Sequence, residues 1–136
     1  MLLRVVMVIA LGMAGYVAYG ALTRRQLGRV AAAAAIDPIL RGLEPGRPAI
    51  VYFTTPTCMP CKTQQAPALD RLQAELNDLQ IIRIDATQDC DAADRWGVLS
   101  VPTTFVIDGS GQPREVNHGV ADTAKLKRQL QAVAAC

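Results

Sequence analysis

Residues 49–61 have the sequence AIVYFTTPTCMPC, in which an unbroken apolar run is followed by a turn and then by two closely spaced cysteines. The apolar run, Ala49 to Phe53, is typical of a strand that is buried on both faces of a sheet. Beyond it, apolar side chains recur at the spacing of an amphipathic helix, and these are Ala66, Leu69, Leu72 and Leu76. The sequence therefore predicts a strand, a turn and a helix from Met59 to Leu79, kinked at Pro67.

The two cysteines at this junction, Cys58 and Cys61, suit thiol–disulfide chemistry. A thiolate, and not a thiol, attacks a disulfide, and the unpaired backbone N–H groups at the start of a helix favour the anion. We therefore predict that Cys58 is the attacking nucleophile and that Cys61, inside the first turn, is the resolving thiol. Pro60 fits the first turn, where its missing N–H costs nothing.

Zinc binding is the alternative use of a cysteine pair. The other two cysteines, Cys90 and Cys136, stand alone, and His118, the one histidine, lies in a predicted strand without the spacing of a zinc ligand. The pattern favours redox chemistry and requires no metal or organic cofactor. We expect Cys90 to be a partly buried residue at a helix start and Cys136 to be too poorly fixed for catalysis.

Downstream of the first helix, the periodicity alternates between strand and helix. Residues 81–84 predict a second strand, and a short polar helix follows and ends at Gly97. Residues 103–107 and 112–118 predict a hairpin, and Asp122 is placed to cap a final helix. The order β-α-β-α-β-β-α predicts an α/β sheet with parallel strands first and an antiparallel hairpin last.

The uncharged stretch from Val5 to Thr23 predicts one transmembrane helix, because its length nearly spans a bilayer core of about 30 Å. A cleaved signal peptide is the alternative. Residues 24–36 form a small-residue linker that is compatible with either a helix or an edge strand. Asp37 then predicts a helix start, so the chain divides into an anchor (1–23), the linker and a domain (37–136).

Charge around the apolar stretch bears on the side of the membrane that the domain occupies. Arg24, Arg25 and Arg29 follow the stretch and Arg4 precedes it, so the positive-inside rule favours a cytoplasmic domain by a small margin over an extracytoplasmic one. The net charge of +2 indicates no nucleic-acid partner. An apolar share of 51% with 19% charged residues excludes a disordered chain.

A second motif, Ser100-Val101-Pro102-Thr103, comes immediately before a predicted strand. Proline has no backbone N–H to donate to a neighbouring strand. A proline at this place therefore indicates either a cis peptide bond or the first residue of the strand. With both motifs in this order, the chain resembles the thioredoxin family from about Asp37 to Val133. The specific parts of the resemblance are FTTPTCMPCK, VLSVPTTFVIDGSGQ and the glycine of HGV.

The resemblance implies a thioredoxin-like fold, with a central mixed sheet flanked by helices and one N-terminal transmembrane helix before it. It implies that Cys58 and Cys61 are the active pair of a protein-disulfide reductase, which acts on protein disulfides and needs an electron donor. The alternatives are an extracytoplasmic oxidase or isomerase, a glutaredoxin-like protein and a non-catalytic docking module. The resemblance also implies that Pro102 is a cis proline. The residues expected to contact substrate surround the cysteine pair and this proline: Met59, Pro60, Val101 and Pro102.

The chain departs from the family pattern at several positions. Thr57 stands where thioredoxins have a tryptophan before the first cysteine, and Met-Pro replaces Gly-Pro between the cysteines. Tyr52 replaces the buried acid that is proposed in the family to take the proton of the second cysteine. Asp85, at the end of the second predicted strand, is the one nearby acid that the sequence offers, although such a residue is more often part of a turn.

Overall fold

The structure is a computed structural model, and it describes residues 1–34 and 37–134. Four strands form one sheet in the order β2-β1-β3-β4. The strands are β1 (Ala49–Thr54), β2 (Gln80–Asp85), β3 (Thr103–Ile107) and β4 (Pro113–His118). β1 and β2 are parallel, whereas β3 is antiparallel to both of its neighbours. The predicted mixed sheet with a closing hairpin is confirmed.

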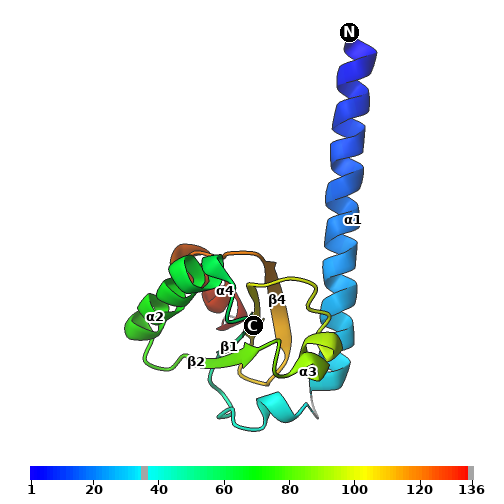
Figure 1. The fold of residues 1–136 in the computed structure, drawn as a ribbon. Helices are drawn as coiled ribbons and strands as arrows, with labels where there is room; N and C mark the ends of the chain where they lie inside the picture. The colour runs from blue at the N-terminus through cyan, green and yellow to red at the C-terminus, as the bar shows by residue number, and fades with distance from the viewer. Residues whose placement is uncertain (35–36, 135–136) are drawn as a thin grey trace.

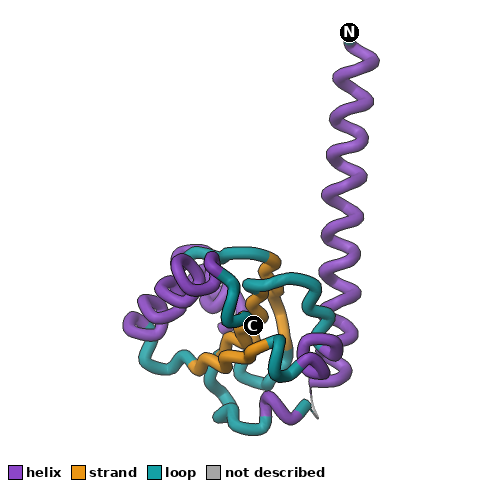
Figure 2. The backbone as a smooth tube through the Cα atoms, in the orientation of Figure 1, coloured by secondary structure: helices purple, strands orange, loops and turns teal. Residues whose placement is uncertain are grey.

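Helices cover both faces of this sheet, and the long α1 leaves the rest of the molecule over most of its length (Figures 1 and 2). The helices are α1 (Leu2–Ala34), η1 (Pro38–Leu40), η2 (Cys61–Gln65), α2 (Ala66–Glu75), α3 (Cys90–Arg95) and α4 (Thr123–Ala134). One core cluster joins α2 and α4 to the sheet, through residues such as Leu72 and Leu126. The other joins α1 and α3 to the opposite face, through Val30 and Ala92.

The helix predicted from Met59 to Leu79 is shorter and less regular than expected. Its first part is the π-helical turn η2, and Pro67 lies in the first turn of α2, where its missing N–H leaves no bond unmade. The regular helix ends at Glu75, since Leu76 adopts an extended conformation. Leu79 is buried outside the helix, in the connection to β2. Asn77 and Asp78 between them favour turns over helix.

Residues 24–34, for which the sequence left helix and edge strand open, continue α1 without a break. Alanine is the strongest helix former, which explains why the small-residue segment extends the helix. Val30 is buried against the sheet, and the Gln26 amide donates hydrogen bonds to the backbone oxygens of Trp96 (3.0 Å) and Gly97 (2.9 Å). The C-terminal part of α1 is therefore docked onto the domain.

Asp37 caps η1 as predicted, but the helix that it begins is a single 3₁₀ turn. Its buried carboxylate accepts hydrogen bonds from the Ile39 N–H, the Trp96 indole (2.9 Å) and the Arg95 guanidinium (3.1 Å). Burial acts to raise the pKa of Asp37, yet these hydrogen bonds outweigh burial and lower it. The ionised Asp37 thus joins η1 to α3.

Candidate active site

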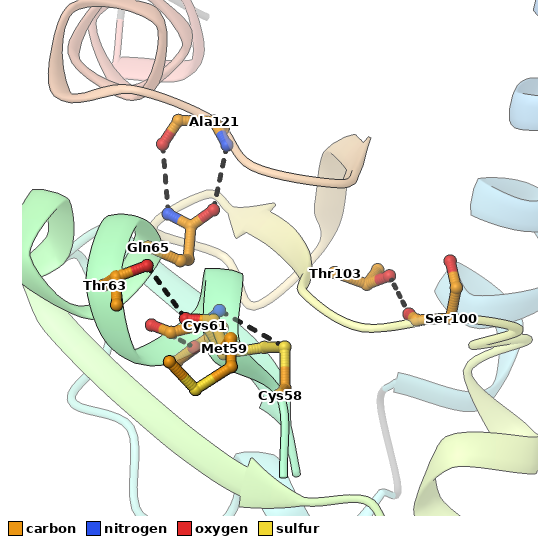
Figure 3. Close-up of a disulfide and its surroundings, with 9 residues drawn as sticks. Cys58, Met59, Cys61, Thr63, Gln65, Ser100, Thr103 and Ala121 are labelled. Atoms are coloured by element: carbon orange, nitrogen blue, oxygen red, sulfur yellow. Dashed lines mark hydrogen bonds between the residues drawn. A yellow bond between two sulfur atoms is a disulfide. The ribbon is translucent and has the colours of Figure 1, made fainter.

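The two cysteines of the predicted pair form a disulfide between the end of β1 and the start of η2 (Figure 3), with an S–S distance of 2.03 Å. Their exposure differs, because Cys58 retains 9% of its accessible surface and Cys61 only 1%. An approaching sulfur therefore reaches Cys58 before Cys61.

The backbone around Cys58 directs a donor toward its sulfur. The Cys61 N–H donates to Cys58 Sγ at 3.2 Å, and the Lys62 N–H donates to the Cys58 carbonyl at 3.3 Å as the helix begins. A fixed donor beside sulfur stabilises the thiolate relative to the thiol. The helical turn supplies further positive potential at the same end. The arrangement favours a reactive anion at Cys58 after the disulfide is reduced.

Tyr52 lies beneath the pair, where the family pattern has an acid. Its hydroxyl donates to the Cys61 carbonyl oxygen at 3.2 Å, and the side chain is 2% exposed. Burial raises the pKa of Tyr52, with partial offset from a hydrogen bond to Thr54 and the charge of Arg83. The phenol is therefore neutral at physiological pH, and it binds the backbone of Cys61 and not its sulfur.

Asp85, the nearby acid that the sequence offered, is a turn residue in the structure. Its carboxylate accepts hydrogen bonds from the Thr87 N–H (2.8 Å) and the Thr87 hydroxyl (2.5 Å). These two bonds lower the pKa of Asp85. A carboxylate occupied in this way is a weak base, so the structure gives it a local role in the β2–α3 connection.

The second motif lies across from the disulfide. The Val101–Pro102 peptide bond is cis, as the resemblance implied. Val101 packs against the core cluster that contains both cysteines, so the two motifs meet in space. The Thr103 hydroxyl donates to the Ser100 carbonyl at 2.7 Å, and the Gly119 N–H donates to the Pro102 carbonyl at 2.9 Å. These bonds fix the loop on both sides of the proline, and Figure 3 shows the bond between Thr103 and Ser100.

Gln65 is a structural residue of the site that the sequence analysis missed. It is fully buried at the end of η2, where its amide donates to the Ala121 oxygen (3.0 Å) and accepts from the Ala121 N–H (2.9 Å). The two bonds fasten the helix after Cys61 to the loop before α4 (Figure 3). The sequence did contain a signal for Gln65: it is a polar residue on the side of the predicted helix where the apolar residues face the core.

The isolated cysteines and the histidine lie outside this arrangement. Cys90 is exposed at the start of α3, which corrects the expectation of partial burial: Ala92 and Ala93 face the sheet in its place. Cys136 lies outside the described residues. His118 ends β4 and its ring makes an edge contact with Tyr19 of α1. Within residues 1–34 and 37–134, no group of three or more acidic, histidine or cysteine side chains is placed to hold a metal.

Comparisons with known proteins agree on one family. The thioredoxin family model matches residues 41–132. Thioredoxin from Bacillus subtilis (strain 168) is 41% identical over 56 residues, which cover 40% of this chain and 53% of that protein. Protein disulfide-isomerase from Oryctolagus cuniculus is 33% identical over 75 residues, which cover 52% of this chain and 15% of that protein. This chain therefore spans about half the length of the first relative and less of the second.

The solved structures extend the likeness to the fold. The X-ray structure of Fasciola hepatica thioredoxin has a TM-score of 0.58 and 27% sequence identity, and the match covers 65% of this chain and 83% of that one. A mutant thioredoxin from Halobacterium salinarum NRC-1 has a TM-score of 0.59 with 26% identity, covering 65% and 76% of the two chains. The matched parts leave about a third of this chain without a counterpart.

Proposed function

This chain belongs to the thioredoxin family, and on that premise we propose that it is a thiol–disulfide oxidoreductase that reduces protein disulfides through Cys58 and Cys61. The observation that carries the proposal is the unequal exposure of the two joined cysteines at a helix start, together with the Cys61 N–H that points at Cys58 Sγ. One sulfur is open to a partner and stabilised as an anion, and the other is held behind it.

The reaction proceeds in two exchanges. The Cys58 thiolate attacks one sulfur of the substrate disulfide, which forms a mixed disulfide and releases the other sulfur as a thiolate. Cys61 then loses its proton and attacks Cys58 Sγ, so that the Cys58–Cys61 disulfide re-forms and the substrate leaves with both sulfurs reduced. Two electrons pass from the Cys58–Cys61 pair to the substrate, and an electron donor must then reduce the pair again. Since Tyr52 is neutral and bonded to a carbonyl, we assign the released substrate thiolate as the acceptor of the Cys61 proton.

Substrate contact is proposed for the residues that border Cys58: Met59, Pro60, Val101 and Pro102. Met59 supports this assignment because it follows Cys58 directly and is 63% exposed. Val101 supports it because it packs against the cluster that holds the disulfide. An extended substrate segment beside Val101 would place its own disulfide next to the open sulfur.

The thiol roles are tested by trapping. In the reduced full chain, Cys61→Ser is expected to accumulate a mixed disulfide with a disulfide-bonded test protein, because the second exchange cannot occur. Cys58→Ser is expected to trap little, and Cys90→Ser is the matched control that leaves turnover unchanged, since Cys90 lies apart from the pair. Adducts are resolved on non-reducing gels. Trapping by Cys58→Ser alone would reverse the assignment of the two thiols.

The direction of electron flow is tested by the reduction potential of the Cys58–Cys61 couple. A value near about −270 mV is typical of reductants such as thioredoxin, and one near about −120 mV is typical of oxidants. We expect a value near the former from equilibration with a glutathione or dithiothreitol buffer of known potential. A value near the latter would assign the pair to disulfide formation.

We also propose that α1 anchors the domain to a membrane. Leu2–Val30 is the one helix in the described part of the chain that is long and apolar enough to cross a bilayer, and its most apolar window has a mean hydropathy of 2.0 and is 0% buried. A signal sequence near the N-terminus would have the same length and composition. Support for an anchor comes from the unbroken helix, which continues from the apolar stretch into the docked segment at Gln26. The trailing arginines favour a cytoplasmic domain.

A further inference from the structure

The edge of the sheet that carries the disulfide lies beside the apolar part of α1. We define this disulfide edge by the end of β1, the start of β3 and the end of β4, where Phe53 pairs with Thr103 and Thr103 pairs with His118. The Tyr19 ring of α1 lies 6.5 Å from the His118 ring. The Val101–Pro102 loop is fastened at the same place, since the Gly119 N–H binds the Pro102 carbonyl. Tyr19 and the disulfide edge therefore lie at one level along α1.

The contacts of α1 also define the direction in which it leaves the domain. Gln26 and Val30 contact the domain further from this edge, at Trp96 and in the core below it. The helix therefore passes the disulfide edge near Tyr19 and continues away from the domain toward its N-terminus (Figure 1). The disulfide edge faces the direction in which the apolar stretch projects.

The length of the uncharged stretch sets the depth of this edge. The stretch ends at Thr23, and Arg24 and Arg25 follow it. Arginines remain in the headgroup layer, which is about 5–7 Å deep on each side of the hydrocarbon core. From Arg24 to Tyr19 the helix rises about 7 Å, at ~1.5 Å per residue. With the arginines in that layer, Tyr19 lies near its inner boundary, where tyrosine is enriched, and the disulfide edge, which lies at the level of Tyr19, is in the headgroup layer at the surface of the hydrocarbon core.

Exposed apolar side chains occur in the segments that form or adjoin this edge. Met59 is 63% exposed, Leu99 is 94% exposed and Val120 is 41% exposed. Met59 follows Cys58, Leu99 precedes the Val101–Pro102 loop, and Val120 follows the Gly119 that is bonded to Pro102. Single exposed apolar residues are ordinary, but three in the segments that border one edge of the sheet are suited to an apolar partner. We call these three residues the apolar rim.

We propose that the substrates of this site are integral membrane proteins whose target disulfide lies at the bilayer surface, on the side that the domain occupies. The inference rests on the proposed function. A disulfide that emerges from a neighbouring membrane segment reaches Cys58 directly, with the apolar rim against that segment. A disulfide of a water-soluble protein has to enter between the domain and the lipid headgroups.

The placement is tested first, with a measurement independent of activity. A fluorescent thiol probe is attached to Leu99→Cys, or to Arg41→Cys near the opposite end of the domain, in a Cys90→Ser/Cys136→Ser background with the Cys58–Cys61 disulfide intact. The full chain is reconstituted in phosphatidylcholine vesicles that contain headgroup spin-labelled lipid. We expect quenching at position 99 to be at least about threefold stronger than at position 41 because of its proximity to the lipid. Equal quenching, or stronger quenching at position 41, would overturn the inference.

The substrate class is tested with one disulfide peptide presented in two ways. The peptide is joined to a transmembrane helix either directly or through a flexible spacer of about 30 residues, and both forms are reconstituted with the reduced full chain at equal surface density. Both forms are confined to the membrane, so confinement alone raises both rates. We expect the directly joined peptide to be reduced at least about tenfold faster. Insertion of a flexible segment between Thr23 and Arg24 should abolish this preference, because it frees the disulfide edge from the bilayer surface.

Two outcomes separate the inference from the function on which it rests. If neither peptide is reduced in detergent solution, the proposed function fails. If both are reduced in detergent but the vesicles show equal rates, the function stands and the proposed substrate class is wrong. The same holds if the inserted segment leaves a tenfold preference unchanged.

Discussion

At the scale of the residue, the site depends on buried polar side chains that satisfy backbone groups left over by helices and strands. Gln65 holds both polar groups of Ala121, and Tyr52 holds the Cys61 carbonyl. A buried backbone group without a partner costs more than a hydrogen bond returns, so such residues have large effects when they are replaced. No buried side-chain nitrogen or oxygen among the described residues lacks a partner.

Replacement of Gln65 by leucine should destabilise the protein strongly. Gln65→Leu keeps a side chain of similar size but leaves the N–H and C=O of Ala121 unpaired, so we expect the free energy of unfolding to fall by about 2–4 kcal/mol. Gln73→Leu, the same change at an exposed position of α2, should alter it by no more than about 0.5 kcal/mol. Urea denaturation measures both. Similar effects of the two substitutions would contradict the structural role of Gln65.

Asp108 should make stability depend on pH. Burial acts to raise its pKa, but hydrogen bonds from Ser110, Arg114 and the Gln112 N–H outweigh burial and lower the pKa to about 2. Since the folded-state pKa lies below the unfolded value of 3.8, the ionised group stabilises the fold above about pH 4, and this stabilisation is lost as the pH falls toward 2.

Asp108→Asn should therefore lower the free energy of unfolding by about 2 kcal/mol at pH 7. The difference from the unsubstituted chain should shrink to a small fraction of this near pH 2, where about half of the Asp108 carboxyls are protonated. Asp78→Asn, at an exposed position, serves as the control and should show a small effect at both pH values. Denaturation curves between pH 2 and pH 7 test this, and a constant difference over that range would speak against it.

At the scale of the element, two polar contacts attach the N-terminal elements to α3. Asp37 joins η1 to the side chains of Arg95 and Trp96, and Gln26 joins α1 to the backbone at the end of α3. Gly97 makes the second contact possible, because its φ of +65° lies in the left-handed region and a Cβ there would lie 3.2 Å from Gln26 Nε2. Gly97, which follows the end of α3, is thus also a contact of α1.

Gly97→Ala should weaken the docking of α1. The left-handed conformation costs alanine about 1 kcal/mol, and the crowding of Gln26 adds to that cost. In a Gln26→Ala background the crowding is absent, so Gly97→Ala should cost less there, with a coupling of about 0.5 kcal/mol or more in a double-mutant cycle of unfolding free energies. Strictly additive effects would show that the two residues do not interact.

At the scale of the whole molecule, one helix links an apolar stretch to the sheet and so sets where the disulfide lies. The apolar stretch extends beyond the domain, whereas the segment around Val30 is part of the core. The proposed membrane insertion and the orientation of the domain are consequently properties of the same element. They can be tested separately, because the apolar stretch and the docked segment are different parts of α1.

The anchor should hold the protein in membranes against salt. We expect the full chain to sediment with membranes, to resist extraction by high salt and to be released by detergent, because hydrocarbon contacts do not depend on ionic strength. Ala10→Arg with Ala14→Arg should permit release, since each charge near the centre of the span costs about 2.5–3.5 kcal/mol. Release of the unsubstituted chain by salt would contradict anchoring.

The exposed Cys90 can report the side of the membrane that the domain occupies. In a Cys136→Ser variant with Cys58 and Cys61 oxidised, Cys90 is the free thiol. The arginines after the apolar stretch predict that an impermeant maleimide leaves it unlabelled in intact cells and labels it after lysis. Efficient labelling in intact cells would place the domain on the extracytoplasmic side, where protein disulfides are more frequent.

The sequence by itself determined the elements of the sheet, the capping residues Asp37 and Asp122, and the junction of strand and helix at Cys58. These features follow from hydrophobic periodicity and from residue types that act within a few positions of one another. The expected cis bond at Pro102 depended on the family resemblance and was confirmed. Predictions were less accurate where two tendencies competed. At Pro67, the apolar periodicity favoured a continuous helix, whereas proline has no N–H to donate within one.

Only the tertiary structure decided the contacts that orient these elements. Gln26 and Trp96 lie 70 residues apart, Asp37 and Trp96 lie 59 apart, and Gln65 and Ala121 lie 56 apart. A local pattern shows that a residue is polar and faces the core, but its partner depends on how distant segments pack. The sequence therefore indicated which two cysteines form the pair at the start of the helix. The fold decided how the disulfide edge is oriented relative to α1, because that orientation depends on where α1 docks.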